Sequence, residues 1–171
     1  PPNLEEYYEK FEHYIKEGYA VLSMSISGEI SVTYDFSTMA AKRIKENYPD
    51  AKIYCLDTAR LSGAFGLLVC YAHEMQKDGK TFEEVIAWLE ENKAKVHQMG
   101  PIDDLLFVAR RGRVTMGAAV MGTIVGIKPL GDFNDRGYTT VLTKVKGINK
   151  ALSTTIDYVK ETAVEIQNQY V

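Results

Sequence analysis

A hydroxyl-rich stretch in residues 23–43 carries side chains suited to holding a small anion. An apolar run breaks there at Ser27 and Gly28, and Ser31 and Thr33 follow at the start of a helix-like segment. A strand that leads into a helix through a short turn points backbone N–H groups and hydroxyl donors at one spot. The pattern therefore predicts a phosphate or carboxylate site. The alternative is a turn whose Ser and Thr side chains only cap the helix, without a ligand.

A second polar position follows the next apolar run. Asp57 and Thr58 end that run, and Ser62 and Gly63 come shortly after it. Ligands of parallel sheets usually bind beyond the carboxyl ends of the strands, so Asp57 is a candidate for the same site. Its alternative role is to cap the turn that follows its strand.

The patterns that most often indicate an enzyme are missing from the sequence. It contains no GxSxG elbow, no GxxxxGKS or GxxxxGKT loop, no GxGxxG and no HExxH. The three histidines have no companion at metal-ligand spacing: His13, His73 and His97. We therefore expect no catalytic residue, no metal and no cofactor.

Composition narrows the class of protein. The chain has 171 residues, of which 46% are hydrophobic and 25% charged, as in one large or two small globular domains. The net charge is −3 and no basic stripe is present, which argues against nucleic acid as a partner. No apolar run approaches the roughly 20 residues of a membrane span. Cys55 and Cys70 lack paired spacing and indicate a reducing compartment, so we expect a cytoplasmic protein.

Helix and strand patterns alternate in the first part of the chain. Apolar residues at helical spacing, start signals and stop signals predict helices at 4–17, about 30–47, from 62 onward and from 82 onward. Strands are predicted at 20–26 and 52–57. This alternation is typical of an α/β domain whose parallel sheet is covered on both faces.

The pattern changes after about residue 95. A short helix at 104–110, a small-residue segment at 113–125, a hairpin of 127–130 with 138–144, and a final helix from about 148 to the end are predicted. We place a domain boundary near residues 95–101, which gives a domain at 1–97 and part of a second α/β domain at 98–171.

Four motifs, in order, resemble those of the DegV family of fatty-acid-binding proteins, and the resemblance covers essentially the whole chain. The first runs from Ile26 to Tyr34 and resembles the family pattern ISSxLSGTY. The others are YCLDTARLSGAFGLLV, IDDLLFVARRGRV and VGIKPL. The sequence departs from the family pattern at three positions that make tight turns less obvious: Gly28, Val32 and Arg111.

The resemblance implies a two-domain α/β protein, of bacterial phospholipid metabolism, with a long-chain fatty acid held between its domains. It implies that hydroxyls near Ser31 hold the carboxylate, with Thr33, Ser27, Gly28 and Arg113 as further ligand-binding residues. A separate fatty acid kinase subunit would then convert the bound acid to an acyl phosphate, so the chain itself would not be an enzyme. The acyl chain would run into an apolar tunnel, with candidates Met24, Ile26, Phe65, Leu67, Met116, Val120 and Met121.

Several alternatives stay open at this point. The same turn would serve an enzyme, kinase- or hydrolase-like, that acts on a small phosphorylated molecule, and a third reading is a pure interaction module. Arg113 has an alternative role too, which is to end a helix and pair with Asp103 or Asp104. Because the family's N-terminal threonine and its C-terminal histidine motif have no counterpart, we expect both domains to be incomplete, as parts of a longer protein.

Overall fold

The computed structural model describes residues 2–112 and 116–168, and it divides into two compact units. One unit consists of residues 1–97 together with 134–138, and the other of residues 98–133 together with 139–171. The first contains a parallel strand pair and the second an antiparallel sheet. The mixed α/β class with a parallel sheet is therefore confirmed.

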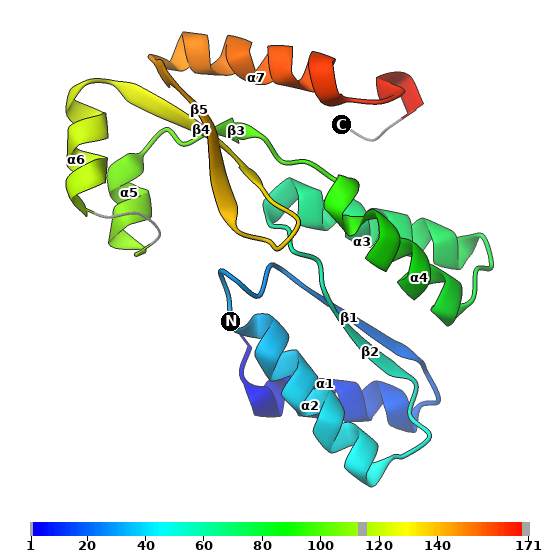
Figure 1. Cartoon of the computed structure of the whole chain (residues 1–171). Coiled ribbons are helices and arrows are strands. Elements are labelled where there is room, and N and C mark those ends of the chain that lie inside the picture. The colour runs from blue at the N-terminus through cyan, green and yellow to red at the C-terminus, as the bar shows by residue number, and fades with distance from the viewer. Residues whose placement is uncertain (1, 113–115, 169–171) are drawn as a thin grey trace. The chain divides into compact units, whose positions relative to one another are not determined.

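The first unit alternates helices with strands, as predicted (Figure 1). Its elements are α1 (Leu4–Lys16), β1 (Val21–Ser25), α2 (Thr33–Asn47), β2 (Ile53–Asp57), α3 (Ser62–Lys77), α4 (Phe82–Asn92) and the short helix η1 (Lys93–Lys95). The strands β1 and β2 run side by side in register from Val21↔Ile53 to Ser25↔Asp57. Their carboxyl ends therefore lie at the same edge of the sheet, where the candidate site was predicted.

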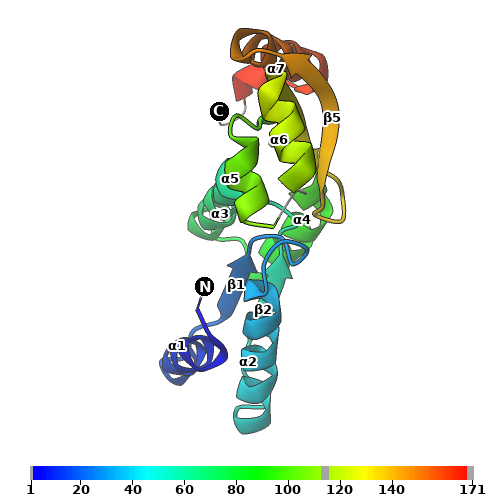
Figure 2. The ribbon, with the colours of Figure 1, turned by 90° about the vertical axis from the view of Figure 1, so that its left-hand side faces the viewer.

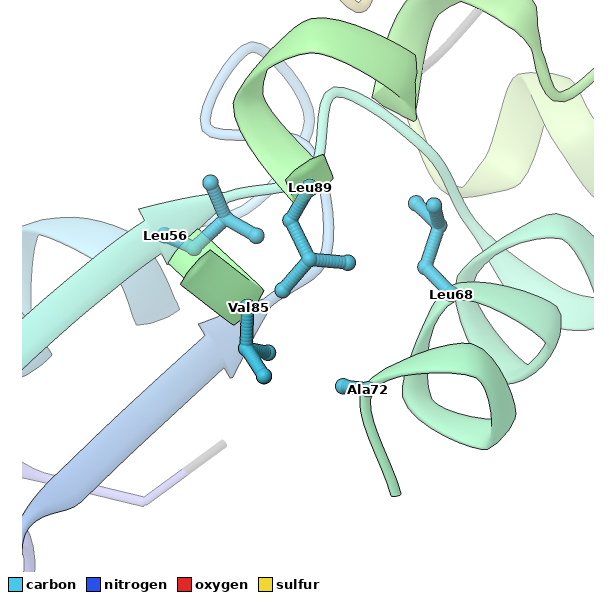
Figure 3. Close-up of a cluster of buried hydrophobic side chains, with 5 residues drawn as sticks. All are labelled: Leu56, Leu68, Ala72, Val85 and Leu89. Atoms are coloured by element: carbon cyan, nitrogen blue, oxygen red, sulfur yellow. The ribbon is translucent and has the colours of Figure 1, made fainter. Parts of the chain in front are cut away.

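Alternation along β2 sends side chains to two separate cores. Ile53 packs with Phe11 of α1 and with Ala40 and Ile44 of α2 on one face. Leu56, on the opposite face, packs with buried residues of α3 and α4 (Figure 3), which are Leu68, Ala72, Val85 and Leu89. Both faces of the strand pair are thus covered by helices, which is the arrangement that the alternating pattern predicts.

Local signals determine where two of these helices begin. Asn3 with Glu6, and Thr81 with Glu84, form complete capping boxes at the starts of α1 and α4. The prediction for α2 was wrong by three residues, because the helix begins at Thr33 and not at about 30. The intervening residues form a separate turn, whose geometry is part of the candidate site.

The second unit is built on the antiparallel sheet β3–β4–β5. Its elements are β3 (Gly100–Pro101), α5 (Leu105–Arg110), α6 (Met116–Ile124), β4 (Ile127–Phe133), β5 (Thr139–Lys146), α7 (Ile148–Thr162) and η2 (Ile166–Asn168). The predicted hairpin is β4–β5, although β4 extends to Phe133 and β5 to Lys146. The final helix ends at Thr162, earlier than predicted, because the backbone of Ala163 is extended.

Helices α5 and α6 lie against each other within this unit (Figure 2). Leu105 and Ala109 of α5 are buried with Ala119 of α6. A Cβ on Gly122 would collide with Leu105 Cδ1, so a larger residue there would displace the Leu105 side chain. Across the described residues, none of the helices combines the length and apolar character that crossing a membrane requires.

Candidate functional site

A tight turn follows β1 and carries the predicted hydroxyls. The carbonyl of Ser27 accepts hydrogen bonds from the N–H groups of Ile30 and Ser31, each at 3.1 Å. Val32 is the N-cap residue of α2, and its side chain makes no capping bond. This turn delays the start of α2, so Ser31 lies just before the helix and not in its first turn.

Ser31 and Thr33 are brought together by this geometry. Their hydroxyl oxygens are 3.1 Å apart, and the N–H of Thr33 donates to Ser31 Oγ at 3.3 Å. Both side chains are half-buried, and the intervening Val32 is exposed. The first N–H groups of a helix have no intrahelical acceptor and carry its positive dipole end. Two hydroxyls at this position, within reach of solvent, suit a carboxylate or a phosphate.

Ser27 is placed differently from Ser31 and Thr33. It is fully buried, its hydroxyl donates to the carbonyl of Gly137 at 2.8 Å, and its oxygen accepts from the N–H of Glu29 at 3.2 Å. Its backbone N–H donates to the carbonyl of Arg60 at 2.9 Å. The one proton of this hydroxyl is therefore directed at Gly137, and Ser27 shapes the turn from within.

Asp57 joins the loops after the two strands. Its Oδ2 accepts from the N–H of Gly28 at 3.1 Å, and its Oδ1 accepts from the N–H of Ala59 at 2.8 Å. Asp57 therefore caps the turn that follows its own strand and also fixes the turn beside it. Ala59 has a φ of 54°, a left-handed conformation that is uncommon for a residue other than glycine. The hydrogen bond from its N–H to Asp57 Oδ1 holds Ala59 in this conformation.

A buried arginine lies behind the same loops, and sequence reasoning missed it. The side chain of Arg60 is fully buried and donates to four backbone carbonyls. Nε donates to Val96 at 2.6 Å, Nη2 to Ala94 at 2.6 Å, and Nη1 to Ala59 at 2.8 Å and Asn134 at 3.1 Å. Arginine is rarely buried, so its position in the sequence offered no signal of this role.

Lys93 links the end of β2 to Glu90 of α4. Lys93 donates to the carbonyl of Asp57 at 2.9 Å and pairs with Glu90 at 2.7 Å. The Tyr54 hydroxyl also donates to Glu90, at 2.7 Å, and this bond raises the pKa of Tyr54 to about 12. Burial, and then the Asp57 carboxylate, raises the pKa of the Tyr34 phenol.

Arg113, the remaining predicted site residue, lies outside the described residues. Its two alternative partners have other bonds: Asp103 forms an ion pair with Lys128, and Asp104 Oδ1 accepts from the N–H of Phe107 at 2.8 Å. The structure thus brings together Ser27, Gly28, Ser31 and Thr33 on one turn, and the role of Arg113 stays a prediction.

Comparisons with known proteins agree with the fold. The family model described as "Uncharacterised protein, DegV family" matches residues 1–171. A DegV domain-containing protein of Clostridium perfringens is 40% identical over 144 residues, which are 84% of this chain and 50% of that protein. The chain spans about half the length of the curated relatives it matches.

Two solved structures are similar over nearly all of the chain. A fatty acid binding DegV family protein from Streptococcus agalactiae is 28% identical, with a TM-score of 0.81 over 96% of this chain and 57% of that one. A DegV family protein from Thermus thermophilus, whose structure is described by its fatty acid binding, is 26% identical, with a TM-score of 0.80 over 96% and 56%. With a family match across its whole length, this chain belongs to the DegV family.

Proposed function

We propose that this protein binds a long-chain fatty acid and holds its carboxylate at the Ser31–Thr33 turn. The observation that carries the proposal is the pair of half-buried hydroxyls 3.1 Å apart at the start of α2. The fatty-acid-binding relatives support the choice of a carboxylate over a phosphate.

The turn matches the chemistry of a carboxylate. Each carboxylate oxygen accepts more than one hydrogen bond, and bonds from hydroxyl and N–H donors to an ionised acceptor are stronger than neutral ones. The positive end of the α2 dipole adds to this attraction. Ser31 and Thr33 are the direct ligands in this proposal, while Ser27 and Gly28 contribute by shaping the turn. Arg113 is proposed to help neutralise the head group.

The acyl chain requires an apolar surface. Burial of each methylene contributes about 0.8 kcal/mol, so a chain of ~16 carbons contributes roughly 10 kcal/mol before its ordering is subtracted. On α6, three of the predicted tunnel residues are exposed: Met116 at 51%, Val120 at 40% and Met121 at 63%. Their role in holding an acyl chain stays a prediction.

We further propose that the protein presents the bound acid to a separate fatty acid kinase subunit and does not catalyse the reaction itself. The sequence motifs of nucleotide-binding and hydrolytic enzymes are missing, which supports a carrier role. Phosphorylation requires that one carboxylate oxygen be reachable, and a half-buried turn at the end of a strand is consistent with that requirement.

Mass spectrometry of the purified protein after denaturing extraction tests the proposal. We expect a fatty acid in about one-to-one ratio with the protein. Isothermal titration of delipidated protein with oleate should then give a saturable site. An empty protein that does not bind oleate, but that hydrolyses or phosphorylates a small molecule, would favour the enzyme alternative.

A further inference from the structure

The Asn134–Tyr138 loop is bonded to the turn that carries the proposed ligands. The loop is itself tightly closed: the N–H of Gly137 donates to the carbonyl of Asn134 at 3.0 Å, and Asn134 Oδ1 accepts from the N–H groups of Arg136 and Tyr138. From the opposite side, the buried hydroxyl of Ser27 donates to the carbonyl of Gly137 at 2.8 Å. Residues 110 positions apart in the sequence are thereby joined.

The contact at Gly137 leaves no room for a side chain. A Cβ there would collide with Ser27 Oγ and would lie 3.0 Å from Ala59 Cα. Gly137 also has a φ of 87°, which glycine adopts readily and other residues rarely do. The Gly137 backbone therefore packs directly on the Ser27 side chain and on the Ala59 backbone, so a shift of the loop would displace Ser27.

Arg60 fixes the loop at its first residue, and Glu29 interacts with its last residue. Arg60 Nη1 donates to the carbonyl of Asn134 at 3.1 Å and to that of Ala59 at 2.8 Å, so one buried guanidinium ties the loop to the segment after β2. At the other end, the interaction with the Glu29 carboxylate raises the pKa of the Tyr138 phenol. Glu29 belongs to the same turn as Ser27, and its N–H donates to Ser27 Oγ.

The chain of contacts continues to the proposed ligands. While the Ser27 side chain is bonded to Gly137, its carbonyl accepts from the N–H of Ser31 at 3.1 Å. Ser31 Oγ in turn contacts Thr33 Oγ1 at 3.1 Å. A movement of Ser27 would therefore change the direction of the Ser31 hydroxyl, although Ser27 itself lies beneath the turn and is fully buried.

We infer that the Asn134–Tyr138 loop positions the carboxylate-binding turn, with Ser27 and Gly137 as the positioning residues that transmit its placement to Ser31. The inference rests on the proposed function, because it assigns a role in holding the same carboxylate. It goes beyond that function in assigning carboxylate selectivity to residues that do not touch the ligand.

The test compares two probes that share an acyl chain and differ in the head group, oleate and oleyl alcohol. A positioning role acts on the carboxylate alone, so Ser27→Ala should lower the affinity for oleate about five- to tenfold and leave that for oleyl alcohol within about twofold. The matched control is Ser37→Ala, which also removes a fully buried hydroxyl but one that donates to the carbonyl of Tyr34 within α2. That variant should keep the wild-type ratio of the two affinities.

A second variant changes the loop instead of the turn. It tests the inference if Ser27→Ala does not fold. Tyr138→Phe removes only a hydroxyl from a side chain that is 48% exposed, and it should lower the oleate affinity about two- to fivefold without changing that for the alcohol. If folded Ser27→Ala and Tyr138→Phe both keep the wild-type ratio, the inference is wrong. If the wild-type protein itself does not prefer oleate to the alcohol, the carboxylate site fails first, and the proposed function fails with it.

Discussion

The N–H of Gly28 donates to Oδ2 of Asp57 at 3.1 Å, and this bond joins the loops that follow the two parallel strands. A Cβ on Gly28 would lie 2.9 Å from the same oxygen, closer than real Cβ atoms approach a neighbour. The other carboxylate oxygen is held by the N–H of Ala59 at 2.8 Å, so Asp57 cannot turn away without losing a bond. Gly28 therefore allows the close approach of the Asp57 carboxylate to the turn.

We predict that Gly28→Ala lowers the free energy of unfolding by about 1 kcal/mol, because the Gly28 or the Ala59 bond to Asp57 must lengthen. The measurement is chemical denaturation. The matched control is Gly66→Ala in α3, where a Cβ would meet nothing within 4 Å, and which should raise stability by about 0.5–1 kcal/mol. Equal stability of the Gly28→Ala variant and the wild type would contradict the close approach.

Ser31→Ala tests the proposed carboxylate ligand. Loss of one hydrogen bond to a charged group should cost about 1.5–3 kcal/mol of binding free energy, a ten- to over a hundredfold loss of oleate affinity in the full-length protein. Ser153→Ala, which removes a hydroxyl that donates to the carbonyl of Lys150 in α7, is the control and should bind as the wild type does.

Thermal melting of the Ser31→Ala variant separates binding from capping. Val32 and not Ser31 is the N-cap residue of α2, although the N–H of Thr33 does donate to Ser31 Oγ at 3.3 Å. A fall in stability with unchanged oleate affinity would show that Ser31 only supports the start of the helix.

Local signals were sufficient to predict much of the fold, and tertiary contacts account for the errors. The capping pairs Asn3–Glu6 and Thr81–Glu84 were recognised because their partners are three residues apart. The start of α2 was misplaced because the Ser27 carbonyl closes an extra turn, which Ser and Thr spacing alone does not indicate. The burial of Arg60 was not predicted, since its partners are carbonyls that become neighbours only after folding.

At the candidate site too, features formed by contiguous residues were predicted, and a contact between distant residues was not. The strand-to-helix turn, and with it Ser31 and Thr33, follows from local pattern because all its residues are contiguous. The Ser27–Gly137 bond spans 110 residues and depends on where a loop between two strands comes to lie. No periodicity or spacing in one sequence encodes such a pair.

Arg60→Lys should be strongly destabilising. A lysine has one nitrogen in place of the guanidinium fork and cannot donate to the carbonyls of Val96, Ala94 and Asn134 from their present positions. Buried carbonyls left without donors should cost about 3 kcal/mol or more in the free energy of unfolding.

Arg43→Lys is the matched control for that substitution. Arg43 is exposed, pairs with Glu5 at 2.7 Å and lies over the Tyr8 ring, and its replacement should cost less than about 1 kcal/mol. Chemical denaturation measures both variants. If the two variants lose similar free energies of unfolding, the burial of Arg60 adds nothing to its contribution to stability.

The Tyr54–Glu90 bond should make stability depend on alkaline pH. The pKa of Tyr54 is raised from 10 to about 12 by its bond to Glu90 and by burial. A raised pKa in the folded state stabilises the protein fully below the unfolded value, and this stabilisation is lost as pH rises through the folded value. The wild type should therefore lose stability between about pH 10 and 12 more steeply than Tyr54→Phe.

At acid pH the Tyr54–Glu90 pair should make stability fall as pH decreases. Burial raises the pKa of Glu90, but the bonds from Lys93 and Tyr54 outweigh it, so the pKa is lowered from 4.5. A lowered pKa gives stability that is present above the unfolded value and is lost as pH falls through the folded value. Denaturation of Glu90→Gln across both ranges should thus show a shallower loss than the wild type below pH 4.5 and above pH 10. Glu83→Gln, which removes a carboxylate of the same helix that pairs with Lys52 instead, should keep the wild-type slope above pH 10, and a slope change there would refute the assignment to Tyr54 and Glu90.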